Sequence, residues 1–97
     1  MKFIEITPEN KPLTIVVGRG NIFQRPYNDV SYILAHVEGS GLANKMCLIS
    51  ISTGQRWASP VPVKDIESLT DEELDMVFAG YNDFVLVSNS KKYKIVY

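Results

Sequence analysis

The predicted fold depends first on residues 30–37, which are VSYILAHV. This stretch is apolar at almost every position and rich in β-branched and aromatic residues, which is typical of a strand in the middle of a sheet. A second apolar run, Met46–Ser52, places apolar residues and serines on opposite faces and predicts a neighbouring strand. We expect the two strands to pair antiparallel, with the connection Glu38–Lys45 at one end of the hairpin.

Further strands are expected on either side of this hairpin. Segments with strand character lie at Phe3–Ile6, Leu13–Val17 and Arg56–Val63. The third segment is expected at a sheet edge, because each of its prolines lacks the N–H donor that a central strand needs. A closing hairpin is expected between Asp83–Ser88 and Tyr93–Tyr97.

One helix is predicted over about residues 70–80. Thr70 and Glu73 have the spacing of a capping box, in which each side chain accepts a hydrogen bond from the other residue's backbone N–H. Leu69 and Leu74 have the spacing of a hydrophobic staple. Gly80 is expected to end the helix as its C-cap.

Together these elements predict an α+β fold. We expect a mostly antiparallel sheet that curls towards a barrel, with one short helix packed against a face. The chain has 97 residues and is expected to form a single domain over 1–97. Its composition, 45% hydrophobic and 22% charged, is that of an ordinary globular protein and argues against disorder.

Charge and cysteine content restrict the expected partners and location. The formal net charge of −1 provides no overall field for duplex nucleic acid or for an anionic membrane, so neither is an expected partner. Cys47 is the single cysteine, so no disulfide can form within the chain, and a reducing, cytoplasmic location is expected. We expect Cys47 to be a small buried hydrophobe, and we expect a homo-oligomer, since association would help so small a core.

Two polar segments are the candidate binding elements. Residues 18–28 and 53–57 combine arginine, aromatic rings, side-chain amides and glycine, with no carboxylate. The first leads into the predicted central hairpin and the second leaves it, so we expect them to meet at one end of the sheet. The candidate ligand-binding residues are Arg19, Asn21, Arg25, Tyr27, Asn28, Gln55, Arg56 and Trp57.

This mixture of side chains suits a phosphorylated nucleotide. Guanidinium groups at Arg19, Arg25 and Arg56 can bind phosphate. Aromatic rings can stack on a base, and amides can read its edge. The alternative is that both segments are ordinary turns, with Trp57 capping the core and Arg56 paired with the acidic helix.

Catalysis is not expected. The chain has one histidine, His36, and one cysteine, and the sequence shows no metal-ligand spacing and no nucleophile motif. We expect no cofactor and no metal. The best hypothesis from the residues is therefore a binding protein.

Several segments resemble small uncharacterised proteins that bacteriophages and prophages of Gram-positive bacteria encode. The segments that carry the resemblance are Tyr27–Val30, Cys47–Ser50, Thr53–Trp57, Pro60–Val61 and the helix that starts at Thr70. Some phage proteins of this size sequester cyclic nucleotide signals of host immunity without cleaving them. The resemblance therefore implies an anti-defence sponge in the cytoplasm of an infected bacterium. The alternative is a protein-binding module that inhibits a host enzyme, with Tyr27, Arg56 and Trp57 as interface anchors.

Overall fold

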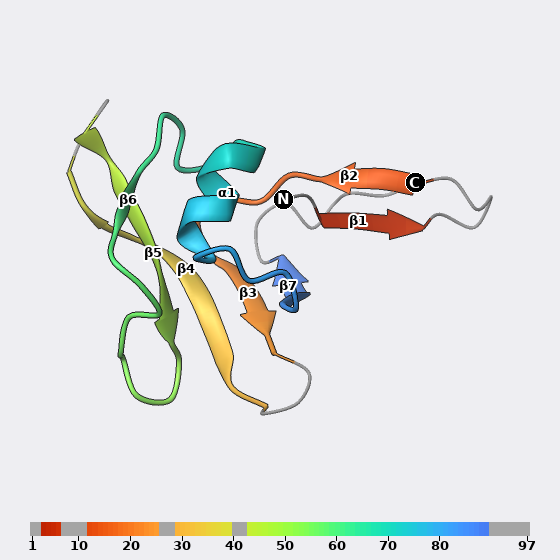
Figure 1. The fold of residues 1–97 in the computed structure, drawn as a ribbon, viewed down its shortest axis with the longest axis horizontal. Coiled ribbons are helices and arrows are strands. Elements are labelled where there is room, and N and C mark those ends of the chain that lie inside the picture. The colour runs from red at the N-terminus through yellow and green to blue at the C-terminus, as the bar shows by residue number, and fades with distance from the viewer. Residues whose placement is uncertain (1–2, 7–11, 26–28, 40–42, 90–97) are drawn as a thin grey trace.

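The computed structural model describes residues 3–6, 12–25, 29–39 and 43–89 (Figure 1). Its main layer is a five-stranded antiparallel sheet in the order β6-β5-β4-β3-β7. The strands are β3 (Asn21–Gln24), β4 (Ser31–Glu38), β5 (Lys45–Ser50), β6 (Val61–Pro62) and β7 (Val85–Asn89). A two-stranded hairpin of β1 (Phe3–Ile6) and β2 (Pro12–Ile15) lies beside this sheet, and one helix, α1 (Asp71–Val77), covers one of its faces. The predicted α+β fold is confirmed.

The central hairpin is the predicted one. β4 and β5 pair antiparallel, with Leu34 opposite Leu48 and Ile33 opposite Ile49. Leu34 and Leu48 are fully buried on the face that α1 covers, which we call the inner face. Ile33 and Ile49 lie on the opposite, outer face, because neighbouring residues of a strand point to opposite sides of the sheet.

β3 was not predicted as a strand. Asn21–Gln24 lies between β4 and β7 and pairs with both. Its two amide residues flank Ile22 and Phe23, and Phe23 is completely buried. β7 was predicted with a partner at residues 93–97, which lie outside the described residues.

The expected barrel is not formed. The sheet ends at β6 on one side and at β7 on the other, with three strands between them. β6 has only two residues, which leaves little backbone for a further ladder. α1 and the segments around it fill the inner face instead, so a hydrophobic cluster forms between helix and sheet.

The helix begins as predicted, but it ends at Val77 with Phe78 as its C-cap, two residues before the expected C-cap Gly80. Thr70 is the N-cap, and both hydrogen bonds of the capping box with Glu73 are present. At the other end, the N–H of Gly80 donates to the carbonyl oxygen of Asp75, and the N–H of Ala79 donates to that of Met76. This pair of bonds is a Schellman motif in which Ala79, at φ +55°, takes the left-handed position normally given to glycine.

Candidate functional site

The structure places the Arg25 guanidinium among three aromatic rings. Its central carbon lies 5.1 Å from the ring centroid of Trp57, 5.1 Å from that of Tyr81 and 5.7 Å from that of Phe84. Trp57 meets Tyr81 and Phe84 edge to face, with ring centroids 5.2 Å apart in both pairs. A cation within about 6 Å of a ring face is attracted by the electrons of the ring. The rings therefore stabilise the charged group of Arg25 and restrict its position.

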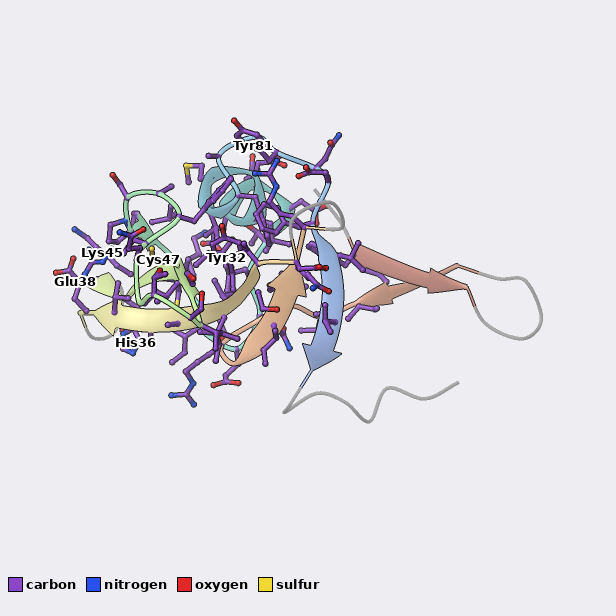
Figure 2. All side chains as sticks on the ribbon, turned by 90° about the horizontal axis from the view of Figure 1, so that it is seen from below. Tyr32, His36, Glu38, Lys45, Cys47 and Tyr81 are labelled. Carbon is purple, nitrogen blue, oxygen red and sulfur yellow. The ribbon has the colours of Figure 1, made fainter. Side chains whose placement is uncertain are left out.

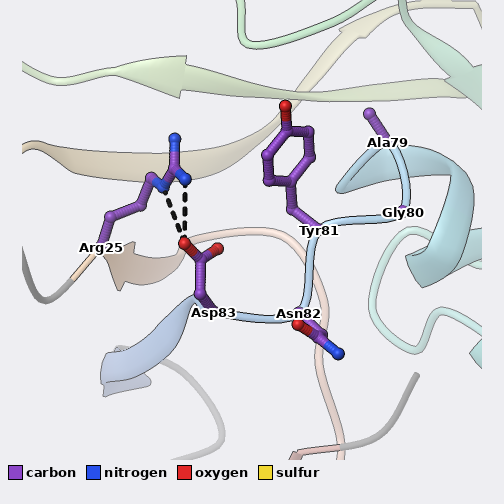
Figure 3. Close-up of a pocket in the computed structure, with 6 residues that line it drawn as sticks. All are labelled: Arg25, Ala79, Gly80, Tyr81, Asn82 and Asp83. Carbon is purple, nitrogen blue, oxygen red and sulfur yellow. Dashed lines mark hydrogen bonds and ion pairs between the residues drawn. The ribbon is translucent and has the colours of Figure 1, made fainter.

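Asp83 completes this arrangement (Figure 3). Its Oδ2 accepts hydrogen bonds from Nη2 of Arg25 at 2.8 Å and from Nε at 3.3 Å. The Arg25 side chain is 13% exposed and that of Asp83 is 32% exposed, so the ion pair is partly shielded from water. We call Arg25, Trp57, Tyr81, Asp83 and Phe84 the Arg25 site.

An open pocket of about 420 Å³ adjoins the Arg25 site. It is lined by Arg25, Ala79, Gly80, Tyr81, Asn82 and Asp83. The Schellman motif forms one wall, because it reverses the chain after α1 and turns residues 81–83 back towards the end of β3. The pocket thus brings together a guanidinium, a half-exposed tyrosine ring, a side-chain amide and a carboxylate.

Trp57 belongs to both the site and the core. Its indole N–H donates to the carbonyl oxygen of Phe78 at the end of α1, 3.2 Å away. Its ring packs against the buried cluster and meets Tyr32 edge to face. The alternative in which Trp57 caps the core is therefore confirmed, and the same packing places its ring beside Arg25.

Arg19 and Asn21 lie at the other end of β3. The backbone N–H of Arg19 donates to Ile66, and its guanidinium pairs with Glu67 at 2.7 Å. Asn21 is 1% exposed and accepts a hydrogen bond from the N–H of Gly18 through Oδ1. These contacts give Arg19 and Asn21 structural roles and keep them away from the pocket at Arg25.

Arg56 lies on the outer face. It forms a bridge with Ile49, and bridged residues share a face of a sheet. Arg25 and the ring of Trp57 contact residues of the inner face, so Arg56 and Arg25 leave the sheet on opposite sides. Gln55 is exposed in the turn before it and is not among the residues that line the pocket.

Of the predicted binding set, the structure brings together Arg25 and Trp57. Tyr27 and Asn28 lie outside the described residues. Tyr81, Asn82 and Asp83 were missed, although the sequence contains a signal: a glycine directly after the helix, followed by an aromatic, an amide and a carboxylate. In the prediction, Gly80 ends the helix and a strand begins at Asp83, and the approach of this segment to β3 becomes visible only in three dimensions.

In the β4–β5 ladder, His36 lies opposite Met46 and Cys47 lies opposite Ala35. Cys47 is buried, as predicted, and its thiol donates to the carbonyl oxygen of Ala58 at 3.1 Å. Figure 2 shows His36 towards the tip of β4, where Glu38 and Lys45 also lie, and Tyr81 on the helix side of the sheet. Within the described part of the chain, no group of histidine, cysteine and acidic residues is arranged to hold a metal ion. No helix among these residues has the length and apolar character needed to span a membrane.

Comparison of the chain with protein-family models, with curated proteins and with solved structures finds no match. The resemblance to phage proteins therefore stays a prediction.

Proposed function

We propose that this protein binds a phosphorylated nucleotide without chemically changing it, at the pocket beside Arg25. One observation carries the proposal: a guanidinium held by aromatic rings lines the same pocket as a half-exposed tyrosine. Arginine binds phosphate through its planar fork, and a tyrosine ring stacks on a nucleotide base.

Each lining residue has a role in this proposal. Arg25 contacts the phosphate, and its fixed position lowers the entropy lost on binding. Tyr81, whose residue surface is 49% exposed, stacks on the base. Asn82 hydrogen-bonds to the base edge, since its amide can both donate and accept. The pocket volume of about 420 Å³ lies within the range of small-molecule sites, which is about 300–1,000 Å³.

The proposal changes the set of binding residues. Of the predicted residues, Arg25 and Trp57 belong to the proposed binding site, and Trp57 acts by holding Arg25 in place. Tyr81 and Asn82 join them as binding residues. Sequestration of a cyclic nucleotide as a phage anti-defence function is part of the same proposal. A protein of that kind acts by stoichiometry, so slow release of the ligand matters more than any turnover.

A melting experiment tests the proposal. The purified protein is heated with a panel of linear and cyclic nucleotides, and a ligand present at 100 times its dissociation constant should stabilise the fold by about 2.7 kcal/mol. Tyr81→Ala should abolish this stabilisation. Arg19→Ala is the matched control and should keep it, because Arg19 is exposed but remote from the pocket. A ligand response that Arg19→Ala removes and Tyr81→Ala keeps would contradict the site.

The outer face of the sheet favours a second candidate function, binding of a protein partner. The ladder places Ile22, Ile33 and Ile49, which are each half-buried, in one row across three strands, and Val85 and Val87 are exposed on the neighbouring strand β7. Antiparallel sheets with one solvated face normally carry polar residues there, and exposed apolar patches mark interaction sites. This surface fits the alternative of a module that inhibits a host enzyme.

The two candidates give different results in one pair of assays. The protein-binding function would be favoured if the wild type captures a partner protein that Val87→Lys loses, and if no nucleotide changes the melting temperature. Val87 is 54% exposed on the outer face of β7, so this change should leave the fold intact.

A further inference from the structure

The charge of Arg25 is compensated inside the pocket that it lines. Asp83 contacts the guanidinium at 2.8 Å and lines the same pocket. The remaining lining residues, Ala79, Gly80, Tyr81 and Asn82, carry no formal charge at neutral pH. Among the described residues, the lining therefore contains one positive and one negative charge.

The carboxylate has little freedom to leave when an anion arrives. Arg25 is held by three rings, and two of its hydrogen bonds go to the same oxygen of Asp83. Asp83 directly precedes Phe84, which is buried in the core, so the backbone at this position is fixed as well. A phosphate that reaches Arg25 must consequently lie close to Asp83.

We propose that Asp83 makes this pocket selective for the singly charged phosphodiester of a nucleotide over a doubly charged phosphomonoester. The inference rests on the proposed nucleotide function. A phosphodiester carries one negative charge, whereas a phosphomonoester carries −1.5 to −2 at pH 7.

Two physical effects favour binding of the singly charged phosphodiester. The cost of removing an ion from water rises with the square of its charge, while its attraction to a single guanidinium rises only in proportion to the charge. Repulsion by Asp83 then reduces the net attraction for each added unit of charge. At about 6 Å and an effective dielectric constant of about 40, one added charge near a carboxylate weakens binding about tenfold.

The test compares nucleotides that differ in phosphate charge. The probes are 3′,5′-cyclic AMP against 5′-AMP, and cyclic di-AMP against its linear form with a terminal monophosphate. Dissociation constants are measured by calorimetry at pH 7.5. In at least one pair, the wild type should bind the diester about tenfold more tightly than the monoester. Asp83→Asn should reduce this preference to less than about threefold, mainly by strengthening monoester binding.

Controls separate the possible failures. Glu72→Gln removes an exposed acidic charge from α1 outside the pocket lining and should leave the preference unchanged. Asp83→Ser replaces Asp83→Asn if the latter does not fold. Equal or tighter binding of the monoester by the wild type, or an unchanged preference in the Asp83 variant, would overturn the selectivity while leaving nucleotide binding in place. If no nucleotide binds at all, the proposed function itself is wrong, and the selectivity falls with it.

Discussion

Trp57→Ala should lower the free energy of unfolding by about 3 kcal/mol. Removal of a large aromatic side chain from a core costs about 3–5 kcal/mol, and the partial exposure of Trp57 places the value near the lower end. The lost contacts include the edge-to-face packing with Tyr32, Tyr81 and Phe84. The carbonyl oxygen of Phe78 also loses its indole donor, which contributes about 1 kcal/mol of the total.

Two further substitutions, one at Trp57 and one at the adjacent Arg56, separate these contributions. Trp57→Phe keeps an aromatic ring but removes the N–H donor, so we expect a loss of about 1–1.5 kcal/mol. Arg56→Ala is the matched control, because it changes the adjacent residue on the outer face, and its effect should stay within about 0.5 kcal/mol.

Urea unfolding followed by circular dichroism measures all three variants. The slope of the free energy against urea should not change, so that the midpoint alone reports stability. For a domain of this size, a loss of 3 kcal/mol corresponds to a fall in Tm of about 12–24 °C. A Trp57→Ala midpoint within 1 kcal/mol of the wild type would refute the assignment of this ring to the core.

Three further substitutions test local features of the backbone. Ala79→Gly should stabilise the protein by about 0.5–1 kcal/mol in thermal unfolding, because φ is +55° at this position; a loss of stability would contradict the Schellman assignment. Thr70→Ala should cost about 1 kcal/mol in urea unfolding through loss of the capping box, and Thr70→Ser should restore most of it. Gly18→Ala should cost about 2 kcal/mol by the same measurement, because its Cβ would collide with the backbone carbonyl of Glu67. Gly54→Ala, where the added Cβ meets nothing within 4 Å, should cost about 1 kcal/mol from its positive φ alone, and an equal effect of the two changes would argue against the close contact at Gly18.

Features encoded by neighbouring residues were predictable from the sequence. The helix start depends on Leu69, Thr70, Glu73 and Leu74, all within six positions, and local hydrogen bonds and packing define it. The central hairpin was predictable for a related reason, since the apolar character of residues 30–37 requires a strand with neighbours on both sides. Its partner β5 follows directly in the sequence.

Features that depend on distant residues were not predictable. Arg25 and Asp83 are separated by 58 positions, and neither residue alone indicates that it meets the other. Asn21–Gln24 lies within the predicted binding segment 18–28, which amides, glycine and arginine indicate, whereas burial of Phe23 between β4 and β7 makes these four residues a strand. The position of Arg56 on the outer face likewise follows from its bridge to Ile49, which composition does not reveal.

The pairing of β3 with β7 has a consequence for synthesis of the protein. Residues 21–24 are synthesised early, whereas Val85–Asn89, the strand that pairs with one of their edges, is synthesised much later. Until the ribosome has produced that segment, Phe23 lacks its cross-strand neighbour Leu86, and one backbone edge of β3 stays unpaired. Pairings between such distant segments form slowly because they close long loops. A nascent chain arrested before Val85 should therefore expose apolar surface and be a preferred substrate for chaperones and proteases.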